Sequence, residues 1–354
     1  MKNQINVLVL GVGGNVSQGI LKAIASSNLN CTVIGACISH ESIGLYLCDT
    51  AYIAPLADSE QFIPWLTDIC NKECVNIVFS GVEENILAIA AQLEEFKKKT
   101  RAVFVCSSYE CLKIGQDKLE TCSWLQANEC NYAKYCKSED ANAAFELIKA
   151  VGYPLIAKPR NGKGSQGIYK VNNENDLKEV LKFENYIIQE YIGNDQDEYT
   201  VGCYCDKSGN LVDMIIMRRE LRYGTTFKAI IVDNDEIKAE VIKICERFKP
   251  IGPLNIQLRL DKNKRPVCFE LNVRFSGTTP IRAHFGFNDV AAMVKEYVLH
   301  QDISAEFNVK KGISYRYMNE MYLVDDVQKI IQQDGIIKEM NKYDISVDTL
   351  GGKH

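Results

Sequence analysis

The sequence predicts an α/β protein in which a doubly wound domain with a parallel sheet comes first and an α+β region follows. Short apolar runs alternate with helical patterns over residues 5–106, and this alternation is typical of a parallel sheet covered by helices on both faces. Further along, the apolar runs at 254–260 and 266–273 flank a polar turn that predicts a hairpin. A length of 354 residues also favours more than one domain.

The first domain begins with a strand at residues 5–10 (INVLVL), which runs into Gly11 and then into helical spacing over 17–25. A strand, a tight glycine turn and a helix are the opening unit of a doubly wound sheet. The other elements expected here are strands at 31–38, 75–81 and 101–106 and helices at 60–71 and 83–96.

The second region contains more strands than helices. Its expected helices lie at 117–128, 139–150 and 235–248, and its expected strands at 154–159, 168–171, 186–192, 199–206, 211–218, 254–260 and 266–273. Residues beyond 303 show no clear pattern, so we expect them to complete a domain or to form a contact between copies of the chain.

Composition excludes several classes of function. Hydrophobic residues make up 46% and charged residues 25%, as in ordinary globular proteins. The 41 Lys and Arg against 46 Asp and Glu give a net charge of −5 without a concentrated basic face, which argues against a nucleic-acid partner. No apolar stretch approaches the ~20 residues that span a bilayer. The 14 cysteines are scattered, with no signal peptide and no paired CxxC, so we expect reduced thiols, no zinc and a cytoplasmic protein.

The first glycine turn is a weak candidate for a dinucleotide site. In the segment Gly11 to Gly19, the third glycine of a GxGxxG pattern would fall at Val16, and the second strand leads to His40 rather than to an acidic residue that could hold a ribose. We therefore expect a structural turn. An NAD(P)-dependent oxidoreductase remains the alternative for this segment.

A second glycine-rich loop is better suited to phosphates. Lys158 ends an apolar strand, and NGKGSQG (161–167) follows. Flexible backbone N–H groups beside an ammonium suit a triphosphate, although the spacing is not that of a Walker A loop. A solvated hairpin is the plainer interpretation of this loop alone.

The final hairpin carries a third candidate. Glu270, Asn272 and Arg274 are spaced by two and project from one face of a strand, and Gln257 lies on the partner strand. Oxygen ligands beside a guanidinium suit a magnesium–phosphate site. A merely polar strand face would show the same pattern.

In their order, these features resemble the ATP-grasp superfamily, and most closely the carbamoyl phosphate synthetase large-subunit type. The resemblance rests on QDK (116–118), YPLIAKP with NGKGSQG (153–167), IIQEYIG followed by DEYTV (187–201), and NIQLRL…CFELNVRFSGTT (255–279). It implies a preATP-grasp domain over 1–112, an ATP-grasp fold over 113–302 made of two α+β subdomains that clasp ATP, with a lid at about 130–190, and an extension over 303–354. A full large subunit has two such halves, so we do not expect this chain alone to make carbamoyl phosphate.

The resemblance also implies cofactors and residue roles. ATP and one or two Mg²⁺ ions, or Mn²⁺ in their place, would be bound. Lys118 and Lys158 would contact the phosphates; Gly162, Lys163, Gly164, Ser165 and Gly167 would form the lid; Gln189, Glu190, Tyr191 and Ile192 would meet adenine; Glu198 would hold the ribose; Gln257, Glu270 and Asn272 would bind metal, with Gln257 also near the nucleotide. Arg274 and Lys158 would be catalytic, with Arg274 stabilising the transferring phosphoryl group.

A carboxylate substrate needs its own cations, and Arg218, Arg219, Arg222 and Arg282 are the candidates, because guanidinium groups suit bidentate carboxylate capture. An exposed, salt-bridged strand would look the same. The leading hypothesis is an ATP-dependent carboxylate–amine ligase that acts through an acylphosphate and releases ADP and phosphate. A small-molecule acid and amine would be its partners, and a homodimer is left open. The alternatives are the oxidoreductase and a non-catalytic ATP-binding subunit.

Overall fold

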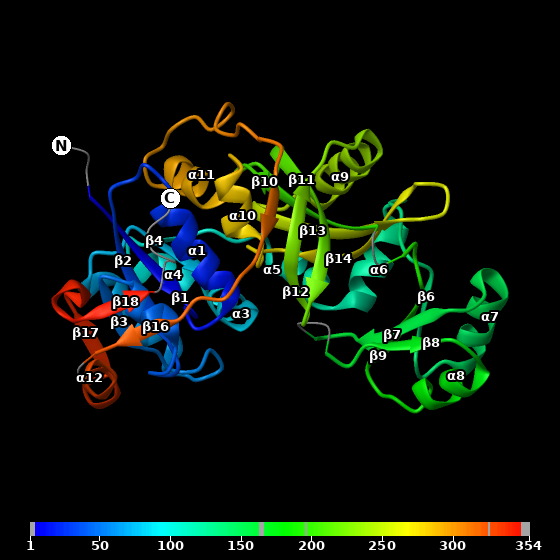
Figure 1. Ribbon diagram of the computed structural model, residues 1–354, viewed down its shortest axis with the longest axis horizontal. Coiled ribbons are helices and arrows are strands. Elements are labelled where there is room, and N and C mark those ends of the chain that lie inside the picture. Colours follow the sequence, from blue (N-terminus) through cyan, green and yellow to red (C-terminus); the bar gives the residue numbers. More distant parts are fainter. Residues whose placement is uncertain (1–3, 163–165, 195–196, 325, 348–354) are drawn as a thin grey trace. The chain divides into compact units, whose positions relative to one another are not determined.

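The computed structural model describes residues 4–162, 166–194, 197–324 and 326–347, which form two compact units (Figure 1). Unit 1 contains residues 1–106, 274–309 and 316–354, and unit 2 contains residues 107–273 and 310–315. The division differs from the continuous domains expected from the sequence, because residues 274–302 belong to the unit that holds the N-terminal sheet.

Unit 1 is built on a sheet whose five N-terminal strands run parallel. The strands are β1 (Ile5–Leu10), β2 (Cys31–Cys37), β3 (Thr50–Ile53), β4 (Ile77–Ser80) and β5 (Val103–Phe104), joined at one edge by β17 (Ile336–Lys338) in the order β17-β3-β2-β1-β4-β5. Only β17 is antiparallel to its neighbour. The predicted parallel sheet is therefore present, and a strand from the C-terminal segment, which the sequence pattern did not reveal, extends it.

The helices of unit 1 pack on this sheet or on one another. They are α1 (Asn15–Ala25), α2 (Phe62–Lys72), α3 (Glu83–Ala91), α4 (Leu93–Lys99), α10 (Thr279–His284), α11 (Asp289–Tyr297) and α12 (Val327–Asp334), with short 3₁₀ turns η1 (Ile43–Leu47) and η2 (Met340–Lys342) and a small pair of strands, β16 (Met321–Leu323) and β18 (Ile345–Val347). Helices α10 and α11 pack on α1, where a Cβ at Gly19 would lie 2.8 Å from a Pro280 ring carbon. The Asn288 amide also donates to the Ala23 carbonyl at 2.8 Å. These contacts explain why residues 274–302 belong with the N-terminal sheet.

Unit 2 contains a large antiparallel sheet. Its strands are β10 (Glu198–Cys205), β11 (Leu211–Arg222), β12 (Thr225–Ile231), β13 (Gly252–Leu260), β14 (Pro266–Asn272) and β15 (Ile313–Tyr315), in the order β14-β13-β10-β11-β12-β15. Helices α5 (Tyr109–Gln116), α6 (Lys118–Ala127) and α9 (Asp235–Phe248) pack against its strands. Strand β12 was not predicted. It follows a tight turn in which Tyr223 and Gly224 both have positive φ, +50° and +70°, as a two-residue hairpin requires.

A smaller sheet in unit 2 has the order β6-β9-β7-β8. Its strands are β6 (Tyr135–Lys137), β7 (Leu155–Pro159), β8 (Tyr169–Val171) and β9 (Tyr186–Glu190), and its helices are α7 (Ala141–Val151) and α8 (Glu174–Val180). Leu155 and Ala157 of β7 are fully buried in the core that these helices form with the sheet. Because side chains alternate along a strand, Ile156 and Lys158 project from the opposite face.

No helix in the described parts of the chain is both long and apolar enough to cross a bilayer.

Candidate functional site

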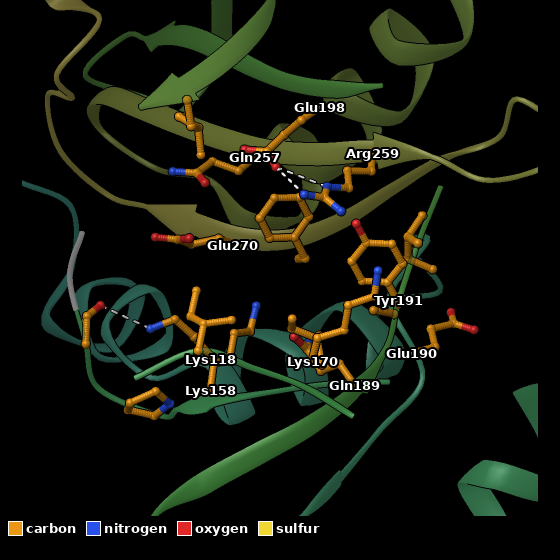
Figure 2. Close-up of a pocket in the computed structure, with 18 of the residues that line it drawn as sticks. Lys118, Lys158, Lys170, Gln189, Glu190, Tyr191, Glu198, Gln257, Arg259 and Glu270 are labelled. Carbon is orange, nitrogen blue, oxygen red and sulfur yellow. Dashed lines mark hydrogen bonds and ion pairs between the residues drawn. The ribbon is translucent and has the colours of Figure 1, made fainter. Parts of the chain in front are cut away.

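A cavity of about 360 Å³ lies in unit 2, with walls from both of its sheets (Figure 2). Its lining residues are Lys118, Ala133, Ile156, Lys158, Pro159, Gly162, Gln166, Ile168, Lys170, Gln189, Glu190, Tyr191, Ile192, Glu198, Arg219, Leu221, Gln257, Arg259, Phe269 and Glu270. Eleven of these positions were singled out from the sequence as nucleotide, metal or substrate contacts, and one further candidate from that set, Asn272, touches the cavity residue Glu270.

Lys158 is the most unusual group of the cavity. Its side chain is 7% exposed, and it forms no ion pair or hydrogen bond with any residue that the structure describes. Burial lowers the pKa of this ammonium, against the opposing field of the Glu270 carboxylate. Its Nζ instead lies 5.1 Å from the centre of the Phe269 ring, a cation–π contact. A buried ammonium that lacks a hydrogen-bond acceptor is a site for an anion.

Lys118 lies at the start of α6; in Figure 2 the Lys158 amino group points into the cavity, whereas that of Lys118 is directed at a backbone carbonyl. The Lys118 Nζ donates to the carbonyls of Arg160 and Gly162 at 3.3 and 3.2 Å. Asp117 caps the same helix by accepting from the Leu119 N–H at 2.9 Å and binds the Arg160 guanidinium at 2.6–3.1 Å. Burial would raise the pKa of Asp117, but Arg160 and the helix N–H groups hold it below its usual value. Asp117 therefore ties the start of α6, and with it Lys118, to the segment that enters the glycine loop.

The lid residues are only partly described. Gly162 lines the cavity, and Gly167 has φ +69° with Tyr186 and Pro159 too close to admit a Cβ. Lys163, Gly164 and Ser165 lie outside the described residues.

The candidate metal ligands lie on neighbouring strands. Gln257 of β13 is directly opposite Glu270 of β14, and Asn255 is opposite Asn272. The Asn272 amide donates to Glu270 Oε1 at 3.1 Å, which leaves Glu270 Oε2 and Asn272 Oδ1 outside that bond. The described residues contain no cluster of three or more His, Cys, Asp or Glu that could hold a metal by themselves. A cation at this position would therefore share its coordination with amide oxygens and a ligand.

An irregularity in β14 adds an aromatic wall. The pairing with β13 shifts between Gln257 and Leu258, so that Glu270 and Cys268 face consecutive residues and Phe269 is extra. A bulge of this kind lets two successive side chains share a face, and Phe269 and Glu270 both line the cavity. Strict alternation would have placed Phe269 on the other side, which is why the sequence did not indicate it.

Glu198 lies at the centre of a buried ion network. Its Oε1 accepts from Nε and Nη2 of Arg219 at 3.0 and 2.7 Å, and its Oε2 accepts from Nε and Nη2 of Arg259 at the same two distances. Burial of this carboxyl would raise its pKa, but the two guanidinium groups hold the pKa of Glu198 below its usual value. Arg219 Nη2 also donates to Gln257 Oε1 at 2.7 Å. Four N–H donors use the approximately four lone-pair positions of a carboxylate, so the network satisfies Glu198 without a ligand.

The segment from Gln189 to Ile192 follows the end of β9 into the cavity wall. The Gln189 side chain is buried and its Nε2 lies 2.8 Å from the Cys122 sulfur. The Tyr191 ring has Lys170 Nζ at 4.4 Å and the Arg259 guanidinium at 5.1 Å from its centre. The Glu190 carboxylate accepts from the Lys134 N–H at 3.1 Å and points away from the lysines in Figure 2. Glu190 therefore lines the cavity with atoms other than those of its carboxylate.

Four predicted arginines do not line this cavity, and one of them, Arg218, is exposed on β11. Arg274 belongs to unit 1, where it binds Glu83 at 2.8 Å. Arg282 is also in unit 1, fully buried and 2.7 Å from the equally buried Asp289, so it is not available to a substrate in this structure. Arg222 is exposed and stacks over the Phe227 ring at 3.5 Å.

Several cavity residues were missed by the sequence analysis. Arg259 was detectable, because it follows Gln257 by two positions on the same strand and so shares its face. Lys170, Ile168 and Leu221 carried no signal, since an apolar or basic residue near a strand end is ordinary.

Two protein-family models match the chain. Residues 7–104 match the family described as PylC-like, N-terminal domain, and residues 182–321 match the family described as ATP-grasp in the biosynthetic pathway with Ter operon. The chain is an ATP-grasp superfamily protein. Its predicted fold class, a preATP-grasp domain with a parallel sheet followed by ATP-grasp subdomains, is thereby confirmed. The superfamily comprises ATP-dependent ligases.

Relatives of this ATP-grasp protein are distant. The N5-carboxyaminoimidazole ribonucleotide synthase of Staphylococcus saprophyticus is 22% identical over 176 residues, which cover 47% of each chain. The carbamoyl phosphate synthase large chain of Helicobacter pylori is 21% identical over 344 residues, which cover 88% of this chain and 31% of that one. The chain thus matches about half and about a third of the lengths of these two relatives.

Solved structures share the fold across most of the chain. The N5-carboxyaminoimidazole synthetase of Staphylococcus aureus, complexed with ADP, has a TM-score of 0.65 at 18% identity and covers 94% of this chain and 87% of its own. The L-amino acid ligase of Bacillus licheniformis has a TM-score of 0.65 at 16% identity, with coverages of 93% and 85%.

Proposed function

We propose that the protein is an ADP-forming carboxylate–amine ligase whose nucleotide binds in the cavity of unit 2. The observation that carries the proposal is Lys158, a buried ammonium that forms no hydrogen bond with a described residue and faces a cavity large enough for a ligand. Burying an unpaired ammonium costs free energy, and a bound anion offsets that cost. A nucleotide polyphosphate is such an anion.

The cavity is suited to a nucleotide along its whole length. Lys118, Lys158 and the Gly162 backbone form a phosphate end. Ile156, Ile168 and Leu221 supply apolar surface for a base, next to the backbone that follows Gln189. The proposal therefore keeps the phosphate and base roles suggested by the family resemblance. It does not assign the ribose hydroxyls to Glu198, because Arg219 and Arg259 already satisfy that carboxylate.

The donor set beside the phosphate end fits Mg²⁺. Glu270 and Asn272 offer a carboxylate and an amide oxygen, with Gln257 on the neighbouring strand, and Mg²⁺ prefers a few such oxygens together with substrate phosphates. Bound there, the ion would neutralise charge on the phosphoryl groups. Gln257 would first have to release Arg219, so Glu270 and Asn272 are the stronger candidates.

The proposed reaction has two steps. A carboxylate oxygen of the acid attacks the γ-phosphorus of ATP, the bond from that phosphorus to the β,γ-bridging oxygen breaks, and ADP leaves with the electron pair. The amine nitrogen then attacks the acyl carbon of the acylphosphate, phosphate leaves with the electron pair of the carbon–oxygen bond, and the nitrogen loses a proton. Lys118 and Lys158 would stabilise the charge that develops in the first step.

Two further assignments belong to the proposal. Closure of the glycine loop would keep water from the acylphosphate. The resemblance suggests a phosphoryl-stabilising role for Arg274, whose guanidinium binds Glu83 within unit 1. An L-amino acid ligase among the proteins of similar fold is consistent with amide formation.

The test is ADP release that depends on an added acid, with hydroxylamine as the amine. An acylphosphate reacts with hydroxylamine to give a hydroxamate, which is detected with ferric ion. We expect ADP and hydroxamate in equal amounts from a panel of carboxylic acids, and neither product with Lys158→Met. Lys182→Met is the matched control, because Lys182 belongs to unit 2 but pairs with Glu179 at the surface. Acid-dependent ADP release that survives in Lys158→Met would refute the assignment of the site.

A further inference from the structure

A second hollow of unit 2 adjoins the nucleotide cavity and has a positively charged lining. It has a volume of about 730 Å³ and shares Glu198, Arg219, Leu221 and Arg259 with the first cavity. Its other lining residues are Arg218, Glu220, Lys228 and Ile230. Four cationic groups thus face two carboxylates, in a chain whose net charge is −5. A cavity lined by one excess sign of charge attracts ligands of the opposite sign.

Both carboxylates that line this hollow are already paired with cationic side chains of the same lining. Glu198 is satisfied by four N–H donors from Arg219 and Arg259. Glu220 binds Lys228 at 2.8 Å, directly across the β11–β12 pair. The lining therefore has no unpaired carboxylate that could neutralise another of its cationic side chains.

Among the cationic side chains of the lining, Arg218 is the one that no lining carboxylate neutralises. It is exposed to solvent at the hollow and forms no ion pair with any described residue. Arg219 binds Glu198 and Gln257 through Nε and Nη2, so its Nη1 takes no part in that network. Because Glu198 and Gln257 fix the Arg219 guanidinium, little side-chain entropy would be lost when an anion binds to it.

We propose that this hollow is an oxyanion-binding site, separate from the nucleotide phosphates, in which Arg218 and Arg219 hold a carboxylate or phosphate group. Glu198 acts as a positioning residue that fixes Arg219 and Arg259. Lys158 and Glu270 do not line the hollow, so the bound group is not the phosphoryl group in transfer. It is either a second anionic group of the acid substrate, in which case the inference rests on the proposed function, or a free anion that acts as an effector.

The direct test is calorimetric titration of inorganic pyrophosphate and of glutarate into protein saturated with Mg²⁺ and a non-hydrolysable ATP analogue. We expect saturable binding to the wild type and a Kd raised roughly tenfold or more in Arg218→Gln, the loss of one charge-assisted contact. Arg247→Gln is the matched control, because Arg247 pairs with Glu129 away from the hollow. No binding of either probe, or equal Kd values for the wild type and Arg218→Gln, would overturn the proposal.

The same titration without nucleotide on Lys158→Met keeps this inference distinct from the proposed function. That variant lacks the central cation of the nucleotide cavity, so anion binding that persists there and still depends on Arg218 would support the oxyanion site even if the nucleotide proposal failed. Anion binding that disappears with Lys158 would assign the probes to the nucleotide cavity and contradict the inference.

The ADP-release assay then separates the two sources of the anion. If the group belongs to the acid, glutarate is used with a lower KM than butyrate, and Arg218→Gln removes this difference while the KM for ATP stays the same. If the anion is a free effector, pyrophosphate changes the rate with butyrate, and the same variant removes that effect. Either result supports the site. If Arg218→Gln changes neither the KM difference nor the effect of pyrophosphate, the proposal is contradicted.

Discussion

The ammonium of Lys158 lies 5.1 Å from the centre of the Phe269 ring. The two residues come from different sheets of unit 2, β7 of the small sheet and β14 of the large one. Phe269 reaches the cavity only because the β14 bulge brings it to the same side as Glu270. An aromatic face stabilises a cation without supplying a hydrogen-bond acceptor, and so leaves the three N–H donors of Lys158 to a ligand.

Replacing Phe269 with leucine tests this contact. We expect Phe269→Leu to weaken binding of Mg-ADP by about two- to thirtyfold, because a cation–π contact contributes about 0.5–2 kcal/mol, while Lys158→Met weakens it more. Fluorescence titration with a labelled nucleotide would measure both. Equal losses in the two variants would contradict the view that Lys158 itself contacts the phosphates.

Nucleotide affinity should fall as pH rises through the alkaline range. Burial lowers the pKa of Lys158 in the ligand-free protein, and a bound polyphosphate would raise it again, so binding takes up a proton once the pH exceeds the ligand-free pKa. The stability of the free protein changes in the opposite direction: the buried ammonium is a cost at low pH, and this cost is relieved as pH rises through the folded pKa. Calorimetry in buffers of different ionisation enthalpy measures the proton uptake. We expect no such uptake in Lys158→Met, and uptake of equal size in that variant would exclude Lys158 as its origin.

Glu270→Gln should abolish ADP release and leave the fold intact. The carboxylate is partly exposed at the cavity, and among the described residues its hydrogen-bond partner is Asn272, so an amide of the same shape should fit. Loss of a charged ligand beside the phosphates should lower the rate by about a hundredfold or more. Circular dichroism checks the fold, and Glu179→Gln, a surface carboxylate of unit 2, is the control. A Glu270→Gln variant with full activity would rule out this assignment.

Glu198→Gln distinguishes a positioning role from a ribose contact. The change removes one charge from a buried network of two guanidinium groups, and breaking a buried ion pair costs about 3–5 kcal/mol, so we expect a lower unfolding midpoint. The ratio of Kd values for ATP and 2′-deoxy-ATP should match that of the wild type. A ratio that collapses toward one only in the variant would show that Glu198 binds the ribose hydroxyls after all.

Arg282 and Asp289 should act as a structural pair in unit 1. Both side chains are fully buried and 2.7 Å apart, and burial raises the pKa of Asp289 to about 6. Because the folded pKa exceeds the unfolded one, this carboxyl lowers stability progressively as pH rises from about 4 to about 6, and the penalty is complete above that range.

Substitution of one partner tests the same pair. Asp289→Asn leaves a buried guanidinium without its counter-charge, and we expect a loss of about 3–5 kcal/mol in the free energy of unfolding. The double variant Arg282→Met, Asp289→Leu should recover much of that loss, as denaturant titration would show. Losses that simply add in the double variant would mean that the two residues do not depend on each other.

Local patterns predicted most of the fold. The strand at 5–10 and the helix at 235–248 have the bounds expected from the sequence, because apolar periodicity and flanking turns marked both ends. Strand β12 was missed because the two-residue turn before it, Tyr223 and Gly224, is not one of the dipeptides that commonly signal a hairpin. Strand β17 was missed because pairing with a distant strand leaves little local trace.

The site was predictable where motif and alternation agree. Lys158, Gln257 and Glu270 all line one cavity. Phe269 needed knowledge of a bulge, and the burial of Arg282 depended on which unit its helix packs into. The ion network of Glu198 was hidden because both of its partners lie on other strands, and register between strands was not available from single segments.

The most direct test of the central claim is thermal unfolding of the wild type and of Lys158→Met with Mg-ADP, with ADP and EDTA, and with NADH. A ligand that binds only the native state raises the midpoint. We predict a rise with Mg-ADP that weakens with EDTA, is lost in Lys158→Met, and is absent with NADH. A rise with NADH alone, or a rise with Mg-ADP that is unchanged in Lys158→Met, would contradict a nucleotide site in the unit 2 cavity.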